Sequence, residues 1–259
     1  MTLSAENIAV MRGARLAVDG ASFALRKGEL TAICGPNGAG KSSLLGALAG
    51  LLPTSRGLAL LNEAWVGAIP IRERARAIGY LPQGGDPAWD ISVATLAGLG
   101  RLPWAAIPGR PAHARRREDE AAVADALTAM QLTDFADRPV SQLSGGERAR
   151  AMMARVLAGT PRWILADEPL ASLDLAHQRA LAAHLRDQAR GGRGVVVVMH
   201  DLAVARNVAD RVIVMDRGRI AADGLPGTAL SPDIIASVWG VAGRWLGEPG
   251  AMALAVDAE

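Results

Sequence analysis

A chain of 259 residues is long enough for one large α/β domain or two modest ones, and because half of its residues are apolar it can bury a sizeable core. The formal net charge of +2 gives no argument for nucleic-acid binding. The single cysteine, Cys34, excludes a disulfide within the chain, and the longest strongly apolar run, Val195–Met199, is far too short to span a bilayer. We expect no signal peptide, because the first residues lack a basic region followed by an apolar core.

Hydrophobic patterning over the first third of the chain predicts a region rich in strands. Two strands joined by a turn at Arg12–Arg15 precede a short, mostly apolar core strand. The predicted strands are 3–11, 16–25, 29–34, 57–61 and 78–81, and the predicted helices are 43–49 and 71–77.

From Gly84 to about Val140 the strand signals vanish and helical periodicity takes over. Helices are predicted over 92–99 and 115–130, with a proline-rich connection over 102–111 between them. We therefore expect a helical subdomain inserted into an α/β core.

Strands and helices alternate in the remainder of the chain, which predicts a mostly parallel sheet. The predicted helices are 145–158, 176–190, 202–209 and 232–239, and the predicted strands are 163–166, 195–199, 211–216 and 219–222. A short tail is expected to follow the last helix.

The stretch from Gly35 to Ser42 reads G-x-x-x-x-G-K-S between a predicted strand and a predicted helix, which is the context that a phosphate-binding loop needs. Its glycines let backbone N–H groups point inward, and the helix N-terminus adds positive potential for phosphate. Lys41 is expected to reach the β- and γ-phosphates, and Ser42 to place its hydroxyl on Mg²⁺. A glycine-rich turn that binds nothing is the alternative. The predicted nucleotide-binding residues here are Gly35, Pro36, Asn37, Gly38, Ala39, Gly40, Lys41, Ser42 and Ser43.

The apolar strand Trp163–Ala166 ends in two acids, Asp167 and Glu168. Carboxylates at the carboxyl end of a core strand, facing a phosphate loop, suit Mg²⁺ coordination and water activation. A strand followed by a solvated acidic turn is the alternative.

A second short stretch, Leu143–Glu147, reads Leu-Ser-Gly-Gly-Glu and opens a predicted helix. Ser144 is expected to be the N-cap residue, with Glu147 as its capping-box partner. In isolation these five residues predict a well-capped helix and no more.

Beside a phosphate loop, however, Leu-Ser-Gly-Gly-Glu resembles the signature motif of the ATP-binding cassette (ABC) family, and five motifs occur in the family's order over roughly residues 3–240. The resemblance implies an α/β fold: a P-loop NTPase core with a mostly parallel sheet, an N-terminal antiparallel β subdomain and an inserted α-helical subdomain. We expect one ABC ATPase domain over 1–259, with its ATP-binding core over 1–83 and 144–259 and the helical subdomain over 84–143.

The resemblance also implies roles for single residues. It assigns Asp167 to the metal and Glu168 to polarising the attacking water. Gln83 is similar to the Q-loop glutamine, a metal and water contact, and His200 to the switch histidine that contacts the γ-phosphate. Asp174, within Ala-Ser-Leu-Asp, resembles the D-loop at the dimer interface. The expected catalytic residues are thus Glu168, His200, Gln83 and Lys41, and the expected metal ligands are Ser42, Gln83 and Asp167.

Members of this family form head-to-tail dimers in which the phosphate loop of one copy and the signature of the other sandwich ATP. The resemblance therefore implies a homodimer with two composite sites, with ATP and Mg²⁺ as cofactors. The N–H groups of Gly145 and Gly146 can bind the γ-phosphate at a helix start, so that Ser144 and Gly146 act in trans.

One position departs from the family pattern. An aromatic residue that stacks on adenine is usual about 23 residues before the phosphate loop, and Arg12 occupies that position here. A guanidinium plane can stack on a base, so adenine binding is expected to survive while selectivity for ATP over GTP is open. A solvated arginine in a turn is the alternative.

Two stretches, Gly100–Trp104 and Ser172–Gln178, resemble the ATPases of importers for iron–siderophore, haem and vitamin B12. Because the chain ends shortly after Gly224, we expect no regulatory barrel of the sugar-importer kind. This resemblance implies a separate transmembrane permease, an indirect partnership with a periplasmic or surface substrate-binding protein, and a peripheral place on the cytoplasmic face of the bacterial inner membrane. The alternatives are another ABC importer or exporter, or a soluble ABC ATPase without a transport role. His177 and His184 are expected to be surface residues with no carboxylate beside them.

Overall fold

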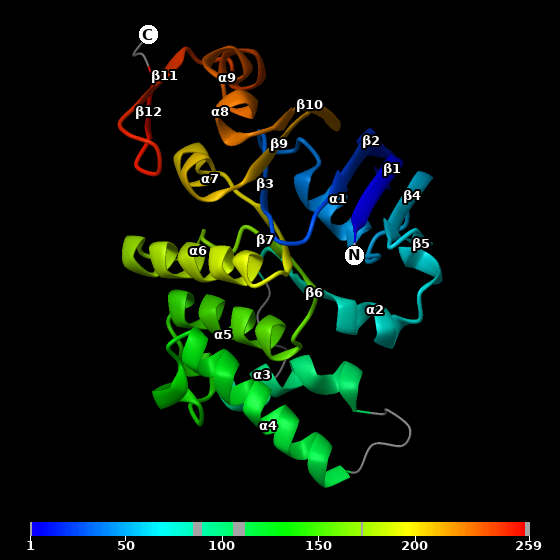
Figure 1. Ribbon diagram of the computed structural model, residues 1–259, viewed down its shortest axis with the longest axis vertical. Helices are drawn as coiled ribbons and strands as arrows, with labels where there is room; N and C mark the ends of the chain where they lie inside the picture. The colour runs from blue at the N-terminus through cyan, green and yellow to red at the C-terminus, as the bar shows by residue number, and fades with distance from the viewer. Residues whose placement is uncertain (1, 85–89, 106–111, 172, 257–259) are drawn as a thin grey trace. The chain divides into compact units, whose positions relative to one another are not determined.

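The structure of the chain is a computed structural model that describes residues 2–84, 90–105, 112–171 and 173–256 (Figure 1). The contacts within the chain divide it into two compact units. Unit 1 comprises the residues up to Ile69, Ala166–Glu168 and the residues from Leu185 onward, and unit 2 comprises Pro70–Leu165 and Pro169–His184. The predicted subdomain boundaries at 83/84 and 143/144 stay predictions.

Unit 1 begins with an antiparallel sheet of strand order β2-β1-β4-β5. Leu3 of the first strand lies opposite Leu25 of the second, and Arg12 lies opposite Arg15 at the turn that joins them. The predicted N-terminal hairpin is thereby confirmed. The strands of this sheet are β1 (Leu3–Arg12), β2 (Arg15–Leu25), β4 (Arg56–Leu61) and β5 (Ala64–Trp65).

The second sheet of unit 1 is built on β3 (Leu30–Cys34), whose residues are all buried. This strand pairs in parallel with β8 (Gly194–Val198) on one side and with β9 (Arg211–Asp216) on the other. β10 (Arg219–Gly224) is antiparallel to β9. β7 (Trp163–Asp167) is divided between the units, with Trp163–Leu165 in unit 2 and Ala166–Asp167 in unit 1. Continuous valine and isoleucine runs suit strands that are covered on both faces. The prediction of a mostly parallel α/β sheet is confirmed.

Besides the last part of α6, unit 1 contains four helices among its described residues, and three of them match predicted helices. The helix that follows β3 starts at the phosphate-loop lysine, and the one that follows β8 starts just after His200. They are α1 (Lys41–Leu48), α7 (Leu202–Val208), α8 (Pro226–Ala229) and α9 (Pro232–Trp239). A single 3₁₀ turn, η1 (Val66–Ala68), follows β5.

The tail expected after residue 239 contains a hairpin, β11 (Gly243–Leu246) and β12 (Ala253–Val256). Asn207, at the end of α7, holds it by two hydrogen bonds of 2.8 Å to the backbone N–H and C=O of Met252. Trp245 adds a 2.7 Å hydrogen bond from its indole N–H to the carbonyl of Leu230. These partners are distant in sequence, so local patterning gave no sign of the hairpin.

Unit 2 is mainly helical. Its longest helices, α4 (Ala112–Ala129) and α5 (Gly145–Ala158), pack against each other and against α3 (Val93–Gly98) (Figure 1). The predicted helices 145–158 and 71–77 are confirmed residue by residue. The unit also contains α2 (Ile71–Ala77), β6 (Ile78–Leu81), the first part of α6 (Leu175–Arg190), and the 3₁₀ turns η3 (Thr133–Phe135) and η4 (Val140–Gln142).

The predicted connection over 102–111 begins inside a 3₁₀ helix, η2 (Leu99–Trp104), and its residues 106–111 lie outside the described part of the chain. The guanidinium carbons of Arg76 and Arg101 lie 5.4 and 5.0 Å from the ring centroid of Trp104. Cation–π contacts thus order a segment in which Pro103 disfavours a regular helix.

Candidate active site

The phosphate loop joins β3 to α1, so the strand–loop–helix context predicted for it is confirmed. Gly35 and Gly40 have φ angles of 149° and 101°. A Cβ at Gly35 would lie 2.2 Å from the carbonyl oxygen of Met215, and a Cβ at Gly40 2.1 Å from that of Ala17. Only glycine fits these two positions, because a side chain would collide with backbone that cannot give way. The loop is therefore fixed by close backbone approach.

Lys41 is held inside this loop. The residue is only 5% exposed, and its Nζ donates hydrogen bonds of 2.8 and 3.0 Å to the carbonyl oxygens of Gly35 and Pro36. Burial lowers the pKa of the ammonium, and the nearby carboxylates of Glu168 and Asp167 oppose that shift. Lys41 thus places a positive charge in the loop with acidic groups close by.

Asp167 and Ser42 form a pair of oxygen donors beside the loop. Burial raises the pKa of the Asp167 carboxyl, a hydrogen bond with Ser42 opposes the rise, and the Glu168 carboxylate adds to it. Among the described residues, no group hydrogen-bonds the buried Oδ1 of Asp167. A buried carboxylate oxygen without a partner among the described residues, next to a hydroxyl, fits Mg²⁺, which binds one or two carboxylates and completes its shell largely with phosphate and water.

Glu168 and His200 are in contact. The His200 Nε2 and a Glu168 carboxylate oxygen form an ion pair in which the Glu168 side chain is 9% exposed and the His200 side chain 42%. Glu168 has a positive φ of 52°, and such strain persists where the surroundings enforce it. Asp201 caps α7 directly after His200, accepting hydrogen bonds from the N–H groups of Ala203 and Val204. The resemblance to the ABC family implies separate roles for these two side chains and does not predict that they touch.

In unit 2 the expected capping box is confirmed at the start of α5. The Ser144 hydroxyl accepts from the Glu147 N–H at 3.2 Å, and the Glu147 carboxylate accepts from the Ser144 N–H at 2.8 Å. That backbone hydrogen bond lowers the pKa of Glu147. Gly145 and Gly146 are the first two residues of the helix, and a Cβ at Gly145 would meet no atom within 4 Å. The helix start is folded and accessible.

Two further predicted residues also belong to unit 2. Gln83 follows β6 and is exposed. Asp174 accepts a 2.9 Å hydrogen bond from the backbone N–H of His177, which lowers its pKa, and pairs with the Nδ1 of the same histidine at 2.8 Å. The expectation that no carboxylate lies beside His177 is therefore wrong. Ser172 of the same motif lies outside the described residues.

The structure brings five predicted residues together in unit 1: Lys41, Ser42, Asp167, Glu168 and His200. It places Arg12 at the end of β1, exposed and opposite Arg15. It also shows a contact that the motif analysis missed, because Arg15 rather than Arg12 hydrogen-bonds the phosphate loop, through Nη2 to the carbonyl of Gly38 at 2.9 Å.

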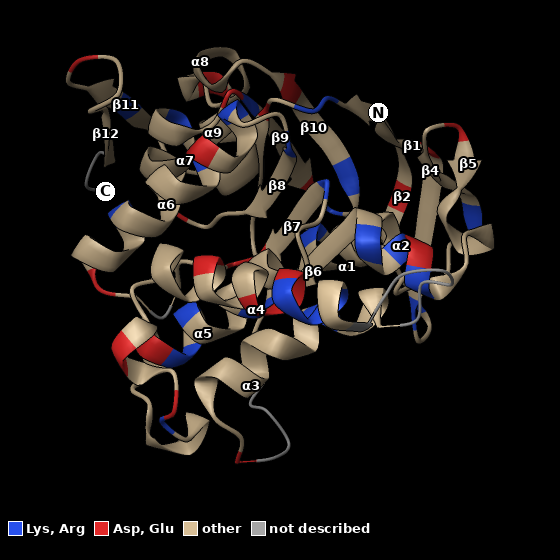
Figure 2. Cartoon of the chain, turned by 60° about the horizontal axis from the view of Figure 1, so that its bottom comes forward, with Lys and Arg blue, Asp and Glu red and all other residues tan. Residues whose placement is uncertain are grey.

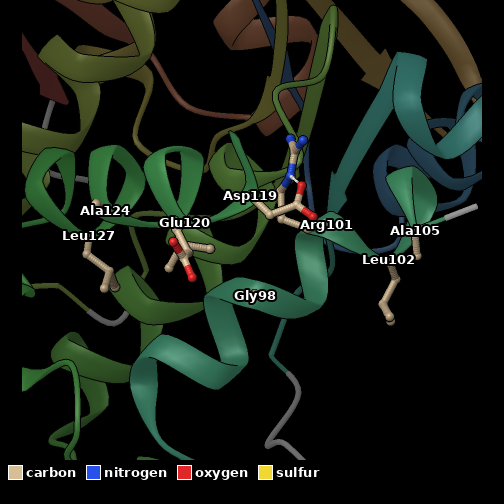
Figure 3. A pocket seen from close by; sticks show the side chains of 9 residues that line it. Gly98, Arg101, Leu102, Ala105, Asp119, Glu120, Ala124 and Leu127 are labelled. Atoms are coloured by element: carbon tan, nitrogen blue, oxygen red, sulfur yellow. Dashed lines mark hydrogen bonds and ion pairs between the residues drawn. The ribbon is translucent and has the colours of Figure 1, made fainter. Parts of the chain in front are cut away.

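Unit 2 also holds an open cavity of about 480 Å³ between η2 and α4 (Figure 3). Figure 3 shows Leu102 and Ala105 on one side of it and Ala124 and Leu127 on the other. Leu102 is 62% exposed. The acids beside the cavity already have partners: Asp119 pairs with Arg101 at 2.7 Å and Glu120 with Arg116 at 2.8 Å. Figure 2 shows basic and acidic residues next to each other on α4. The cavity therefore offers an apolar surface.

A phosphate loop with a buried lysine, a partner-less aspartate oxygen and a neighbouring glutamate defines a P-loop nucleotide hydrolase. The chain belongs to the ABC transporter family, because its residues 18–171 match the family described as "ABC transporter". It is an ABC-type ATPase subunit. No helix among the described residues combines the length and the hydropathy needed to cross a membrane.

Comparison with known proteins supports this assignment. The chain is 42% identical over 240 residues to the hemin import ATP-binding protein HmuV of Rhodococcus jostii (strain RHA1), covering 93% of this chain and 80% of that protein. It superposes with a TM-score of 0.80 and 24% identity on a chain from the inward-facing structure of an ABC transporter described as of the metal-chelate type, covering 99% and 96% of the two chains. A dimeric ATP-binding cassette bound to ADP and Pi in a post-hydrolysis state superposes with a TM-score of 0.74 and 25% identity, covering 86% and 98%.

Proposed function

We propose that this ABC importer ATPase hydrolyses ATP to drive uptake of haem, within the importer group for iron–siderophore, haem and cobalamin-type substrates, through a separate membrane permease. The observation that carries the proposal is the 42% identity, over 93% of the chain, to a hemin import ATP-binding protein. The predicted partners also include, indirectly, a periplasmic or surface substrate-binding protein, and the predicted place is the cytoplasmic face of the inner membrane.

The chemistry proposed for unit 1 follows from its contacts. Glu168 accepts the proton of the attacking water, because its carboxylate is nearly buried and is held by His200. Lys41 offers its ammonium to the β- and γ-phosphates in exchange for its loop carbonyl partners. Mg²⁺, when bound, neutralises charge on the β- and γ-phosphates, and Ser42 and Asp167 are its proposed ligands here, with Gln83 as a third. Arg12 is proposed to lie against the base.

The signature residues are proposed to act on the nucleotide of a partner copy in a head-to-tail homodimer. The N–H groups of Gly145 and Gly146 open α5, where the helix dipole favours an anion, and Ser144 adds a hydroxyl next to them. The capping box keeps this helix start in place without a ligand. Asp174 is proposed to line the interface.

The cavity between η2 and α4 is proposed to receive the permease. Its acids are neutralised within unit 2, and the exposed Leu102 lies at its edge. An apolar side chain on a cytoplasmic helix of the permease suits such a surface better than a charged one, because burying Leu102 removes apolar area from water.

The test is genetic. In the native host, deletion of the gene should abolish growth with haem as the sole iron source, while growth on ferric siderophores and use of vitamin B12 continue. The wild-type gene should restore growth on haem, whereas Lys41→Ala should not. Unimpaired growth of the deletion strain on haem would overturn haem as the substrate.

A further inference from the structure

The turn of the β1–β2 hairpin lies against the phosphate loop through one side chain. Arg15 Nη2 donates a 2.9 Å hydrogen bond to the carbonyl oxygen of Gly38. A Cβ at Gly38 would lie 3.6 and 3.7 Å from the two terminal nitrogens of Arg15, so both ends of the guanidinium lie close to this glycine. All of these atoms belong to unit 1.

The guanidinium of Arg15 has donor capacity beyond this contact. Its five N–H groups can serve several acceptors, and the side chain is exposed. Within the described part of the chain, no carboxylate forms an ion pair with it. The acid further along the same strand, Asp19, is already held by Arg56 at 2.9 Å and by Arg219 at 2.8 Å. Arg15 therefore places at the edge of the loop a cation that no carboxylate of the described residues pairs with.

We propose that Arg15 contacts the nucleotide directly, donating hydrogen bonds to the phosphate nearest the nucleoside. The proposal rests on the proposed ATPase function and adds a binding residue that the family's motifs do not contain. Lys41 occupies the inner end of the loop, where the β- and γ-phosphates are expected, whereas Arg15 approaches the loop at Gly38 from the hairpin that carries Arg12. The planar guanidinium can donate hydrogen bonds to two phosphate oxygens at once, and its hydrogen bond to the Gly38 carbonyl orients it before the nucleotide binds.

This role makes predictions that a merely structural role does not. A phosphate contact is shared by ATP, ADP and GTP, so its loss weakens all three by the same factor. A base contact would change the ratio of ATP to GTP affinity instead. A residue that only braces the loop would lower the melting temperature of the nucleotide-free protein when it is truncated.

The experiment is titration of the full chain with MgATP, MgADP and MgGTP, together with steady-state ATPase kinetics and thermal unfolding. The variants are Arg15→Ala, Arg15→Lys and, as a matched control, Arg26→Ala, which removes an exposed arginine from the turn after β2. Arg15→Ala should weaken all three nucleotides about tenfold, as expected for losing one charge-assisted hydrogen bond. KM should rise with kcat within about twofold, and the melting temperature should stay unchanged.

Arg15→Lys should recover part of the lost nucleotide affinity, because lysine keeps the positive charge but not the planar guanidinium. The control should behave as wild type. Unchanged ADP affinity in Arg15→Ala would overturn the proposal. A loss of affinity for ATP but not for GTP would also overturn it, and so would a lowered melting temperature with unchanged affinity for all three nucleotides. If the wild-type chain itself neither bound nor hydrolysed ATP, the proposed function would fail instead, and the two failures are thereby distinguished.

Discussion

Two helix starts in this molecule are built in opposite ways. Helix α1 starts at Lys41 after Gly40, whose φ is 101°, and in the described structure no side chain caps it. Helix α5 starts after Ser144, and its capping box satisfies the helix end from within the chain. The first start is shaped by backbone packing and the second by side-chain hydrogen bonds.

The two helix starts differ in how much they gain from a bound anion. The exposed donors of an uncapped helix start gain most from an anion, so the loop before α1 suits tight phosphate binding. At the start of α5 the capping box already provides hydrogen-bond partners for backbone N–H groups, so this helix start stays folded without an anion. Its other N–H groups can bind a phosphate when one is brought to them. We infer that the loop binds nucleotide first and that the signature joins afterwards.

The largest effect should come from the chemistry beside α1. Glu168→Gln should leave ATP affinity close to wild type and reduce hydrolysis roughly 100-fold or more, because the amide cannot take the proton of water. Phosphate release and nucleotide titration measure the two quantities on one preparation. Turnover within a few-fold of wild type would refute the role of Glu168.

The two helix starts can be compared by the same substitution. Gly40→Ala should lower the free energy of unfolding by roughly 1–3 kcal/mol, because alanine is strained at this φ and its Cβ would meet the Ala17 carbonyl at 2.1 Å. Gly145→Ala should change it by less than about 0.5 kcal/mol, since its Cβ enters open space. ATP hydrolysis should nevertheless fall in Gly145→Ala if the γ-phosphate of the nucleotide bound by the partner copy lies at this helix start.

Gly224→Ala provides the control for this pair, because its Cβ also meets no atom within 4 Å. Chemical denaturation of the three variants without nucleotide measures the stability changes. Equal stability of Gly40→Ala and Gly145→Ala would contradict the contrast between a packed loop and an open helix start.

The smallest effects concern pH, and the two units should respond with opposite sign. Burial raises the pKa of Asp167 above its ordinary value of 3.8, so the stability of the folded chain falls as the pH rises from that value, and the whole loss is present above the folded pKa. Asp167→Asn should therefore raise the melting temperature of the nucleotide-free chain at about pH 7.5, and the gain should shrink towards about pH 4.

Glu147 behaves in the reverse sense. Its pKa is lowered by the Ser144 N–H, so its contribution to stability is present above its ordinary value of 4.5 and is lost as the pH falls through the folded pKa. Glu147→Ala should lower the melting temperature at neutral pH and matter less in acid, with a smaller change than Asp167→Asn because the side chain is near the surface. If the melting temperatures of both variants changed with pH in the same direction, a buried Asp167 and a hydrogen-bonded Glu147 would be contradicted.

Sequence patterning predicted the elements that local periodicity and capping determine. The core strand β3, the helix α5 with its capping box and the phosphate loop were all placed correctly, because each is encoded by neighbouring residues. The β11–β12 hairpin was missed, since Asn207 holds it from 45 residues away.

The same limit applies to the site. Motif order supplied the residues Lys41, Ser42, Asp167, Glu168 and His200, but the contacts between them are long-range. The ion pair of Glu168 with His200 joins the ends of β7 and β8, and the contact of Arg15 with Gly38 crosses 23 residues. Pairwise geometry of this kind depends on how strands lie side by side and has no local signature.

The most direct test of the composite site is the oligomeric state of Glu168→Gln with and without ATP, measured by light scattering. The double variant Glu168→Gln/Ser144→Arg keeps the phosphate loop and alters only the signature that is proposed to act in trans. Glu168→Gln should form a dimer when MgATP is added, whereas the double variant should bind ATP with similar affinity and stay monomeric. ATP-dependent dimerisation of both proteins to the same extent would contradict a site shared between two copies.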